Sequence, residues 1–239
     1  MIVLFLGLLC LLLCVPRLRT APRAIGLAAL VYALSELATM LPVWLGPQFN
    51  FGLQRNWTGK ALSVLLSLLV IYGFKWVSPA EVGLNRPRPG SWRAGGPVVL
   101  GFAVLQMLST ALGPLRPAPS VEAYLYQLTM PGIAEELLYR GTFLGLLSQA
   151  FPRTISFFGT RTSWGGLVGV GLFLLAHGLV FDGPLTLLPQ AHFPLGRILD
   201  KLLFGTLFLW VRERSGSCLV AMAAHNLMNV GLLLGTSLS

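Results

Sequence analysis

Apolar stretches of about 20 residues recur along the whole sequence, and about 20 residues is the length at which a helix crosses a bilayer. We predict a helical span in each of eight ranges: 1–15, 24–44, 59–76, 96–114, 131–149, 164–181, 195–211 and 217–236. Only helices and closed barrels satisfy the backbone in lipid, and these stretches lack the alternating pattern of a barrel. The sequence therefore predicts an all-α fold, a polytopic transmembrane helical bundle of about eight spans, forming a single membrane domain over residues 1–239.

The charged residues are too few for a soluble surface. They make up 10% of the chain, with 55% hydrophobic residues and a mean hydropathy of +0.75, whereas a soluble domain has about 25% charged residues. The 17 Lys and Arg outnumber the 8 Asp and Glu, but they lie in short loops. No basic stripe with interleaved aromatic residues is present, which argues against a nucleic-acid partner. We expect the lipid bilayer of the cell (plasma) membrane as the surroundings.

The basic residues also predict an orientation. One set of alternate loops holds eleven of them, whereas the other holds Arg55, Lys60 and Arg116, with Arg197 at a helix start. By the positive-inside rule the first set is cytoplasmic, and both termini lie outside. The eleven residues are Arg17, Arg19, Arg23, Lys75, Arg86, Arg88, Arg93, Arg153, Arg161, Arg212 and Arg214.

The segment before the fifth span has a different character. Residues 120–130 (SVEAYLYQLTM) are short and amphipathic, so we expect them to lie at the membrane surface. Pro131 then starts the fifth span, as proline favours the first helical position. On this reading Glu135 lies about four residues, or ~6 Å, into the span.

Ionisable and polar residues inside spans are functional candidates, because burying them in lipid is costly. The fifth span contains Glu135, Glu136 and Arg140, and the sixth contains His177. The eighth contains His225 and Asn229. Glu36 in the second span is also intramembrane, and we interpret it as a structural partner or an interfacial residue.

Helical spacing predicts different tasks for the two adjacent glutamates. Glu136 and Arg140 are four residues apart on one helix face, so we expect a buried ion pair between them. Glu135 is turned by about 100° from Glu136, so we expect it to have no cationic partner. A desolvated, unpaired carboxylate has a raised pKa, which suits a general base.

The histidines complete a hydrolytic constellation. His225 and Asn229 share a helix face, and their N–H groups could hold the oxygen of a polarised carbonyl. Phe173 lies one turn before His177 and could pack against its ring. No Ser or Cys nucleophile accompanies these residues, so water would be the nucleophile.

Three motifs in this order resemble one known family. Residues 135–140 (EELLYR) fit EExxxR, residues 173–177 (FLLAH) fit FxxxH, and residues 225–229 (HNLMN) fit HxxxN. This order on successive hydrophobic helices resembles the CPBP family, the CAAX-protease and bacteriocin-processing group also called Abi proteins. The resemblance covers about residues 78–232 and implies a helical intramembrane endopeptidase.

The resemblance also implies roles for the candidate residues. Glu135 and His177 would activate water, and His225 with Asn229 would stabilise the oxyanion. Glu136 and Arg140 would hold the site together. Glu135, His177 and His225 could instead ligate zinc, leaving a position for water. An HExxH helix is missing, and the resemblance favours a glutamate mechanism without metal, so we expect no cofactor and keep zinc as the alternative.

The expected substrate is a membrane-associated protein or peptide, with C-terminal processing as one form of the reaction. The alternative function is a non-catalytic membrane scaffold or a bacteriocin-immunity factor. On the orientation above the site lies between the outer interface and the midplane, whereas CAAX enzymes of the family work toward the cytosol. Either the topology is inverted or the substrate is exported, and the charge count favours an exported substrate.

Overall fold

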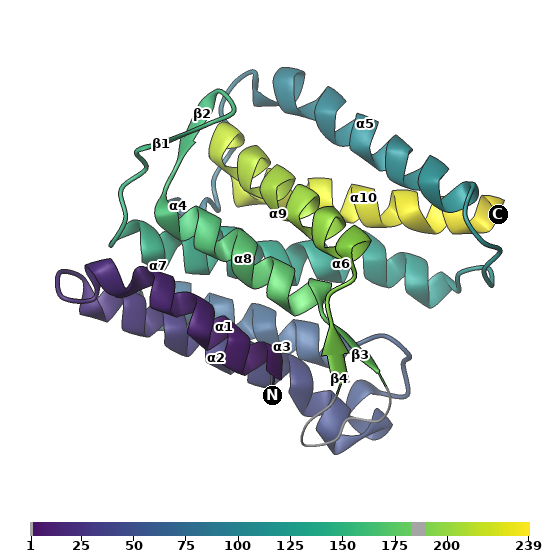
Figure 1. Cartoon of the computed structure of the whole chain (residues 1–239), viewed down its shortest axis with the longest axis horizontal. Helices are drawn as coiled ribbons and strands as arrows, with labels where there is room; N and C mark the ends of the chain where they lie inside the picture. Colours follow the sequence, from purple (N-terminus) through teal and green to yellow (C-terminus); the bar gives the residue numbers. More distant parts are fainter. Residues whose placement is uncertain (1, 183–189) are drawn as a thin grey trace.

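Helices make up most of the computed structural model, which describes residues 2–182 and 190–239 (Figure 1). The α-helices are α1 (Ile2–Cys10), α2 (Pro22–Leu45), α3 (Trp57–Leu68), α4 (Pro79–Val82), α5 (Ser91–Ala111), α6 (Val121–Glu136), α7 (Leu144–Ser148), α8 (Trp164–Gly178), α9 (Leu195–Ser215) and α10 (Cys218–Leu238). The tighter 3-10 segments are η1 (Leu11–Arg17) and η2 (Pro47–Asn50), and the wider π-helical segments are η3 (Leu69–Gly73) and η4 (Leu137–Phe143). The all-α fold class is therefore confirmed.

Two small antiparallel hairpins depart from the all-α prediction. Strand β1 (Ile155–Phe157) pairs with β2 (Thr160–Thr162), and β3 (Val180–Asp182) pairs with β4 (Gln190–His192). Each strand has three residues and each sheet two strands. Such hairpins are too small to form a layer of their own, so they serve as connections between helices.

The eight predicted spans are supported in part. Helices occupy each of the eight ranges, but by length and composition three of the described helices, α2, α5 and α10, are long and apolar enough to cross a membrane. Shorter apolar helices cover Leu6–Arg17, Trp57–Gly73 and Trp164–Gly178. These helices support an integral membrane protein, whereas the number eight stays a prediction.

The segment around Pro131 contradicts our prediction. α6 begins at Val121 and runs through Pro131, so residues 120–130 are not a separate surface helix. The side chain of Asn226 on α10 accepts from Gly132 N at 2.8 Å and donates to Thr129 O at 3.2 Å. These bonds satisfy backbone groups beside the proline, which is how proline is tolerated inside a membrane helix. Glu135 therefore lies about 20 Å from the start of its helix, not ~6 Å.

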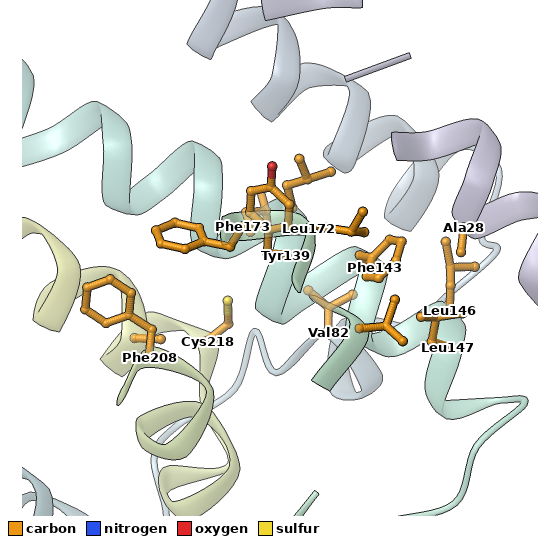
Figure 2. Packing of buried hydrophobic residues seen from close by; sticks show 14 of the residues in the cluster. Ala28, Val82, Tyr139, Phe143, Leu146, Leu147, Leu172, Phe173, Phe208 and Cys218 are labelled. Carbon is orange, nitrogen blue, oxygen red and sulfur yellow. The ribbon is translucent and has the colours of Figure 1, made fainter. Parts of the chain in front are cut away.

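The helices form two groups around a central one (Figure 1). α1, α2 and α3 pack together on one side, and α5, α9 and α10 pack together on the other. α6, η4 and α7 follow one another between them, with α8 alongside. Figure 2 shows the buried side chains of Phe143, Leu146 and Leu147 on this central element, near Ala28 of α2. Residues of the central element are thus in reach of both groups.

The loops gather at two ends of the bundle. At one end Arg88 N donates to Ser215 O at 2.8 Å, and Arg153 pairs with Glu213 at 3.0 Å. At the other end Glu122, in the first turn of α6, accepts from the backbone N–H of Arg55 at 2.9 Å. The loops in which we counted most basic residues therefore come together in the folded chain.

Candidate active site

Glu136 lies at the centre of a buried polar cluster. Arg140 Nη1 lies 3.1 Å from Glu136 Oε1, and both side chains are almost fully buried, so the predicted ion pair is present. His225 Nδ1 also contacts Glu136 Oε1, at 2.8 Å. Arg140 Nη2 donates to Gly205 O at 2.9 Å. Glu136 and Arg140 thus connect the central element to α9 and α10.

A π-helical turn follows directly after the two glutamates. η4 spans Leu137–Phe143 and includes Arg140. Two side chains bond backbone carbonyls beside this turn: Cys218 Sγ donates to Glu136 O at 3.1 Å, and Arg212 Nε donates to Arg140 O at 3.2 Å. Single π-turns inside helices frequently occur at functional sites. Here Cys218 and Arg212 stabilise the widened turn that carries Arg140.

Glu135 has a cationic partner, which contradicts our prediction. Lys60 Nζ donates to Glu135 Oε1 at 2.6 Å, with the side chains of Lys60 and Glu135 16% and 9% exposed. The expectation of a raised pKa rested on an unpaired carboxylate, so its premise is wrong. Lys60 comes from α3, which packs against α6, and we had counted it among the loop charges. Because Lys60 is largely enclosed between helices and paired with Glu135, it no longer belongs to the count of loop charges.

His177 contacts the other oxygen of Glu135. Its Nε2 lies 3.1 Å from Glu135 Oε2, and its Nδ1 lies 3.1 Å from Phe173 O. Because a carbonyl oxygen only accepts, Nδ1 carries a hydrogen. The contact between Nε2 and the carboxylate then needs a proton on one of these two groups. Glu135 and His177 therefore form a pair that shares a proton, as a general acid–base centre does.

Aromatic rings hold both histidines. Phe173 stacks on His177 with ring centroids 4.5 Å apart, as we predicted, and Phe208 stacks on His225 at 4.5 Å. The guanidinium of Arg140 lies 4.5 Å from the Phe173 ring centroid. Phe173 and Phe208 both appear in Figure 2 as part of the hydrophobic core. Stacking of this kind restricts the ring orientation of each histidine.

One cavity of about 220 Å³ brings the four predicted catalytic residues together. Glu135, His177, His225 and Asn229 all line it. Its apolar wall includes Phe204, Phe208, Met228 and Leu232. Gln106, Gln127 and Lys201 add further polar groups to the wall. A cavity in which polar groups converge beside apolar ones is typical of a ligand site.

His225 can donate into this cavity in one protonation state. Its Nδ1 faces Glu136, which is ion-paired with Arg140 and accepts the hydrogen. In the neutral ring Nε2 is then an acceptor, so it donates only from the imidazolium. Asn229 makes no hydrogen bond to a described residue, so both of its N–H groups are available. The predicted pair of oxyanion donors therefore requires a protonated His225.

A second cavity of about 170 Å³ lies on the other side of the Glu135–His177 pair. Both residues line it together with Lys60 and Glu36. We had interpreted Glu36 as a structural partner or an interfacial residue, but within the described residues its carboxylate forms no ion pair. Glu36 lies in the middle of α2 and faces the site.

The zinc alternative finds no support in the geometry. Within the part of the chain that the structure describes, no three His, Cys, Asp or Glu residues are grouped closely enough to hold a metal ion. Glu135 is already paired with the ammonium group of Lys60, and Nδ1 of His225 contacts Glu136, not Glu135. Glu135, His177 and His225 are therefore not arranged as a ligand set.

Sequence reasoning missed three residues that shape the site: Lys60, Phe208 and Asn226. Lys60 carried a signal, since it is a cation within a predicted span. Asn226 is likewise a polar residue in a span, one position after His225. Phe208 had no such signal, because a phenylalanine in an apolar helix is ordinary.

The fold and the site define a helical membrane protein with a buried carboxylate–histidine centre. Residues 117–231 match the family model described as type II CAAX prenyl endopeptidase, Rce1-like. This part of the chain belongs to that CAAX protease family, a family of peptidases. The comparisons with curated proteins and with solved structures gave no match.

Membership implies an intramembrane endopeptidase with protein substrates, and the family generally works through glutamate and histidine without a metal. The matched region contains every candidate residue that we named from the three motifs. Lys60 and Glu36 lie outside it, in the N-terminal helices. The N-terminal part of the chain therefore adds two charged residues to the surroundings of the site.

Proposed function

We propose that this chain hydrolyses a peptide bond of a membrane-associated protein substrate in the cell membrane, with water as the nucleophile. One observation carries the proposal: Glu135, His177, His225 and Asn229, which come from three different helices, line a single cavity. Family membership supports the reaction class. The alternative of a scaffold or immunity factor gives no reason for these groups to converge.

In this mechanism Glu135 and His177 take a proton from water while the water oxygen bonds to the carbonyl carbon of the peptide. The carbonyl oxygen becomes an oxyanion, and Asn229 together with protonated His225 donates hydrogen bonds to it. The carbonyl then re-forms and the C–N bond breaks. The pair, which shares one proton at rest, now holds two, and one of them passes to the leaving nitrogen, which returns the pair to its starting state and balances the reaction.

The supporting residues set the geometry of these groups. Glu136 accepts from His225 and pairs with Arg140, so it stabilises the imidazolium that donates to the oxyanion. Phe173, one helical turn before His177, stacks on its ring, and the carbonyl oxygen of Phe173 accepts a hydrogen bond from His177 Nδ1. Lys60 neutralises the buried charge of Glu135 without a metal ion. We therefore propose a metal-independent reaction.

Substitution of Glu135 by Gln tests the proposal. Gln keeps the shape of the side chain but is not basic, and removing a general base lowers turnover by about 10²–10⁴-fold. The purified protein in lipid nanodiscs would be assayed on fluorogenic membrane-anchored peptides. In parallel, new C-termini would be compared by mass spectrometry in membranes from cells expressing wild-type and E135Q protein.

Glu122→Gln provides the matched control, since Glu122 lies on the same helix and contacts the loop at Arg55 instead of the cavity. Folding of each variant is checked by thermal unfolding in detergent. Equal cleavage by wild-type and E135Q protein would refute the proposed function. Turnover that depends on added zinc would refute its metal-independent form.

A further inference from the structure

A buried hydrolase in a membrane needs a route for its water. Each peptide bond that is cleaved consumes one water molecule, yet the hydrocarbon core of a bilayer supplies none. A substrate peptide would fill the first cavity, which has a volume of about 220 Å³. Water must then reach the Glu135–His177 pair from another side.

The second cavity has the required position. Glu135 and His177 line both cavities, so the pair forms a wall between them. The volume of about 170 Å³ has room for several water molecules, since a single one needs at least ~10–15 Å³ on this measure. The cavity lies among α2, α3, α6 and α8, on the opposite side of the pair from α9 and α10.

The wall of this cavity has the chemistry that holds water. Ser35, Thr39, Asn56 and Ser63 line it beside the charged groups. A stored water molecule needs two to four polar partners. Ser35 and Ser63 hydrogen-bond each other and Thr39 donates to carbonyls of α2, but each hydroxyl oxygen keeps a lone pair that can accept from water. The first cavity has polar side chains on its wall as well, but a bound substrate would occupy it.

Among the side chains that line the second cavity, Glu36 can accept the most hydrogen bonds from water. Its carboxylate has no ion pair or hydrogen bond to a described residue, and its charged neighbours around the cavity are His177, Lys60 and Glu135. An ionised carboxylate offers about four acceptor sites. An unpartnered carboxylate in a polar cavity is stable when water satisfies those sites.

We propose that the second cavity is the water store of the enzyme, with Glu36 as its anchor. Water held by Glu36 and the surrounding hydroxyl groups passes to the Glu135–His177 pair while the substrate occupies the first cavity. Glu36 is a positioning residue in this scheme, because it acts on the water and not on the peptide. The inference rests on the proposed hydrolytic function.

Two substitutions that make the store apolar test this inference. Glu36→Leu removes the anchor, and Thr39→Leu adds apolar volume at a side chain whose hydroxyl bonds only carbonyls of its own helix. We expect kcat to fall by about tenfold in each variant with KM unchanged, because the substrate cavity is intact. E36Q, whose amide also hydrogen-bonds water, should regain most of the lost turnover.

Leu37→Met is the matched control, since Leu37 is the next residue of α2 and is 38% exposed. All variants are compared by thermal unfolding in detergent, and T39L carries the test if E36L does not fold. If E135Q abolishes cleavage but kcat is unchanged in E36L and T39L, the water store is refuted and the proposed function stands. A rise in KM at unchanged kcat would make the cavity a substrate site and also overturn it. A fall in kcat in E36Q as large as in E36L would also overturn the water store, because it would show that the negative charge of Glu36 matters and its hydrogen bonds to water do not.

Discussion

Glu135 and Glu136 are neighbours in the chain but have different surroundings, because consecutive helical residues are turned by about 100°. Glu136 faces Arg140 and His225 and is fully buried. Glu135 faces Lys60 and His177 and lines both cavities. Each carboxylate contacts one cation and one histidine. The difference that matters for chemistry is access to a cavity, which Glu135 has.

Lys60→Met should show how much of the buried charge of Glu135 depends on this one cation. Removing one partner of a buried pair costs about 3–5 kcal/mol, because a charge stays buried without compensation. We therefore expect K60M to lower the unfolding temperature in detergent strongly. The double variant K60M/E135Q should be less destabilised than K60M, since no uncompensated carboxylate remains.

The comparison is made by thermal unfolding of wild-type, K60M, E135Q and K60M/E135Q protein. If the losses of stability in K60M and E135Q add up to the loss in the double variant, the 2.6 Å contact between Lys60 and Glu135 contributes no coupling energy. Lys75→Met is the control, because Lys75 lies in the loop before α4 and outside both cavities.

At the scale of elements, the helix that carries both glutamates is irregular on each side of them. Before them, Pro131 interrupts the backbone bonding and Asn226 of α10 repairs it. After them, η4 widens the helix, with Cys218 and Arg212 bonding its carbonyls. α10 therefore sets the position of α6 at three points, through Asn226, His225 and Cys218.

Gly132→Ala tests this coupling of α6 to α10. A Cβ atom at Gly132 would overlap the side chain of Asn226 and the carbonyl oxygen of Met222. We expect a loss of about 1–3 kcal/mol in stability, as in other overpacked sites, and a drop in turnover as His225 moves away from Glu136. Thermal unfolding and the peptide assay measure the two effects.

Gly101→Ala on α5 is the matched control, since a Cβ atom there has no neighbour within 4 Å. Alanine favours a helix over glycine by about 1 kcal/mol, so this variant should be at least as stable as the wild type. If G132A behaves like G101A, the close approach of α6 and α10 is not required for the site.

At the scale of the whole molecule, the basic loops and the site lie toward different ends. Arg88 and Arg153 bind residues at the end of α9, where the basic loops meet. The first cavity includes Gln106 and Leu232, in the halves of α5 and α10 that lead away from those loops. By the positive-inside rule the basic end is cytoplasmic, so the cavity should face the outer half of the membrane.

Cysteine labelling in intact cells checks this orientation. Arg86→Cys lies in an exposed loop of the basic end, and Arg116→Cys lies in the exposed loop before α6. A membrane-impermeant maleimide should label R116C and leave R86C unlabelled until the cells are opened. The native Cys14 and Cys218 are buried and Cys10 is partly buried, so labelling of each variant is compared with labelling of the wild-type protein. Labelling of R86C from outside would invert the topology and place the cavity toward the cytosol.

Part of this molecule follows from the sequence alone because it depends on local spacing. The apolar lengths predict helices and a membrane. The spacing of four residues predicts the Glu136–Arg140 pair and the stacking of Phe173 on His177, and both are present. Contacts between residues one helical turn apart need no knowledge of which helices are neighbours.

Four features depend on tertiary structure. They are the pairing of Glu135, the stacking of a ring on His225, the hydrogen bonds that Asn226 makes beside Pro131, and the second cavity. Lys60 and Glu135 are separated by 75 residues, and His225 and Glu136 by 89. Such contacts depend on which helices pack together and at what rotation, and in a membrane an apolar surface alone does not select the neighbour. For this reason the sequence predicts Glu135 as the chemical centre, whereas only the packing of α3 against α6 reveals that Glu135 pairs with Lys60.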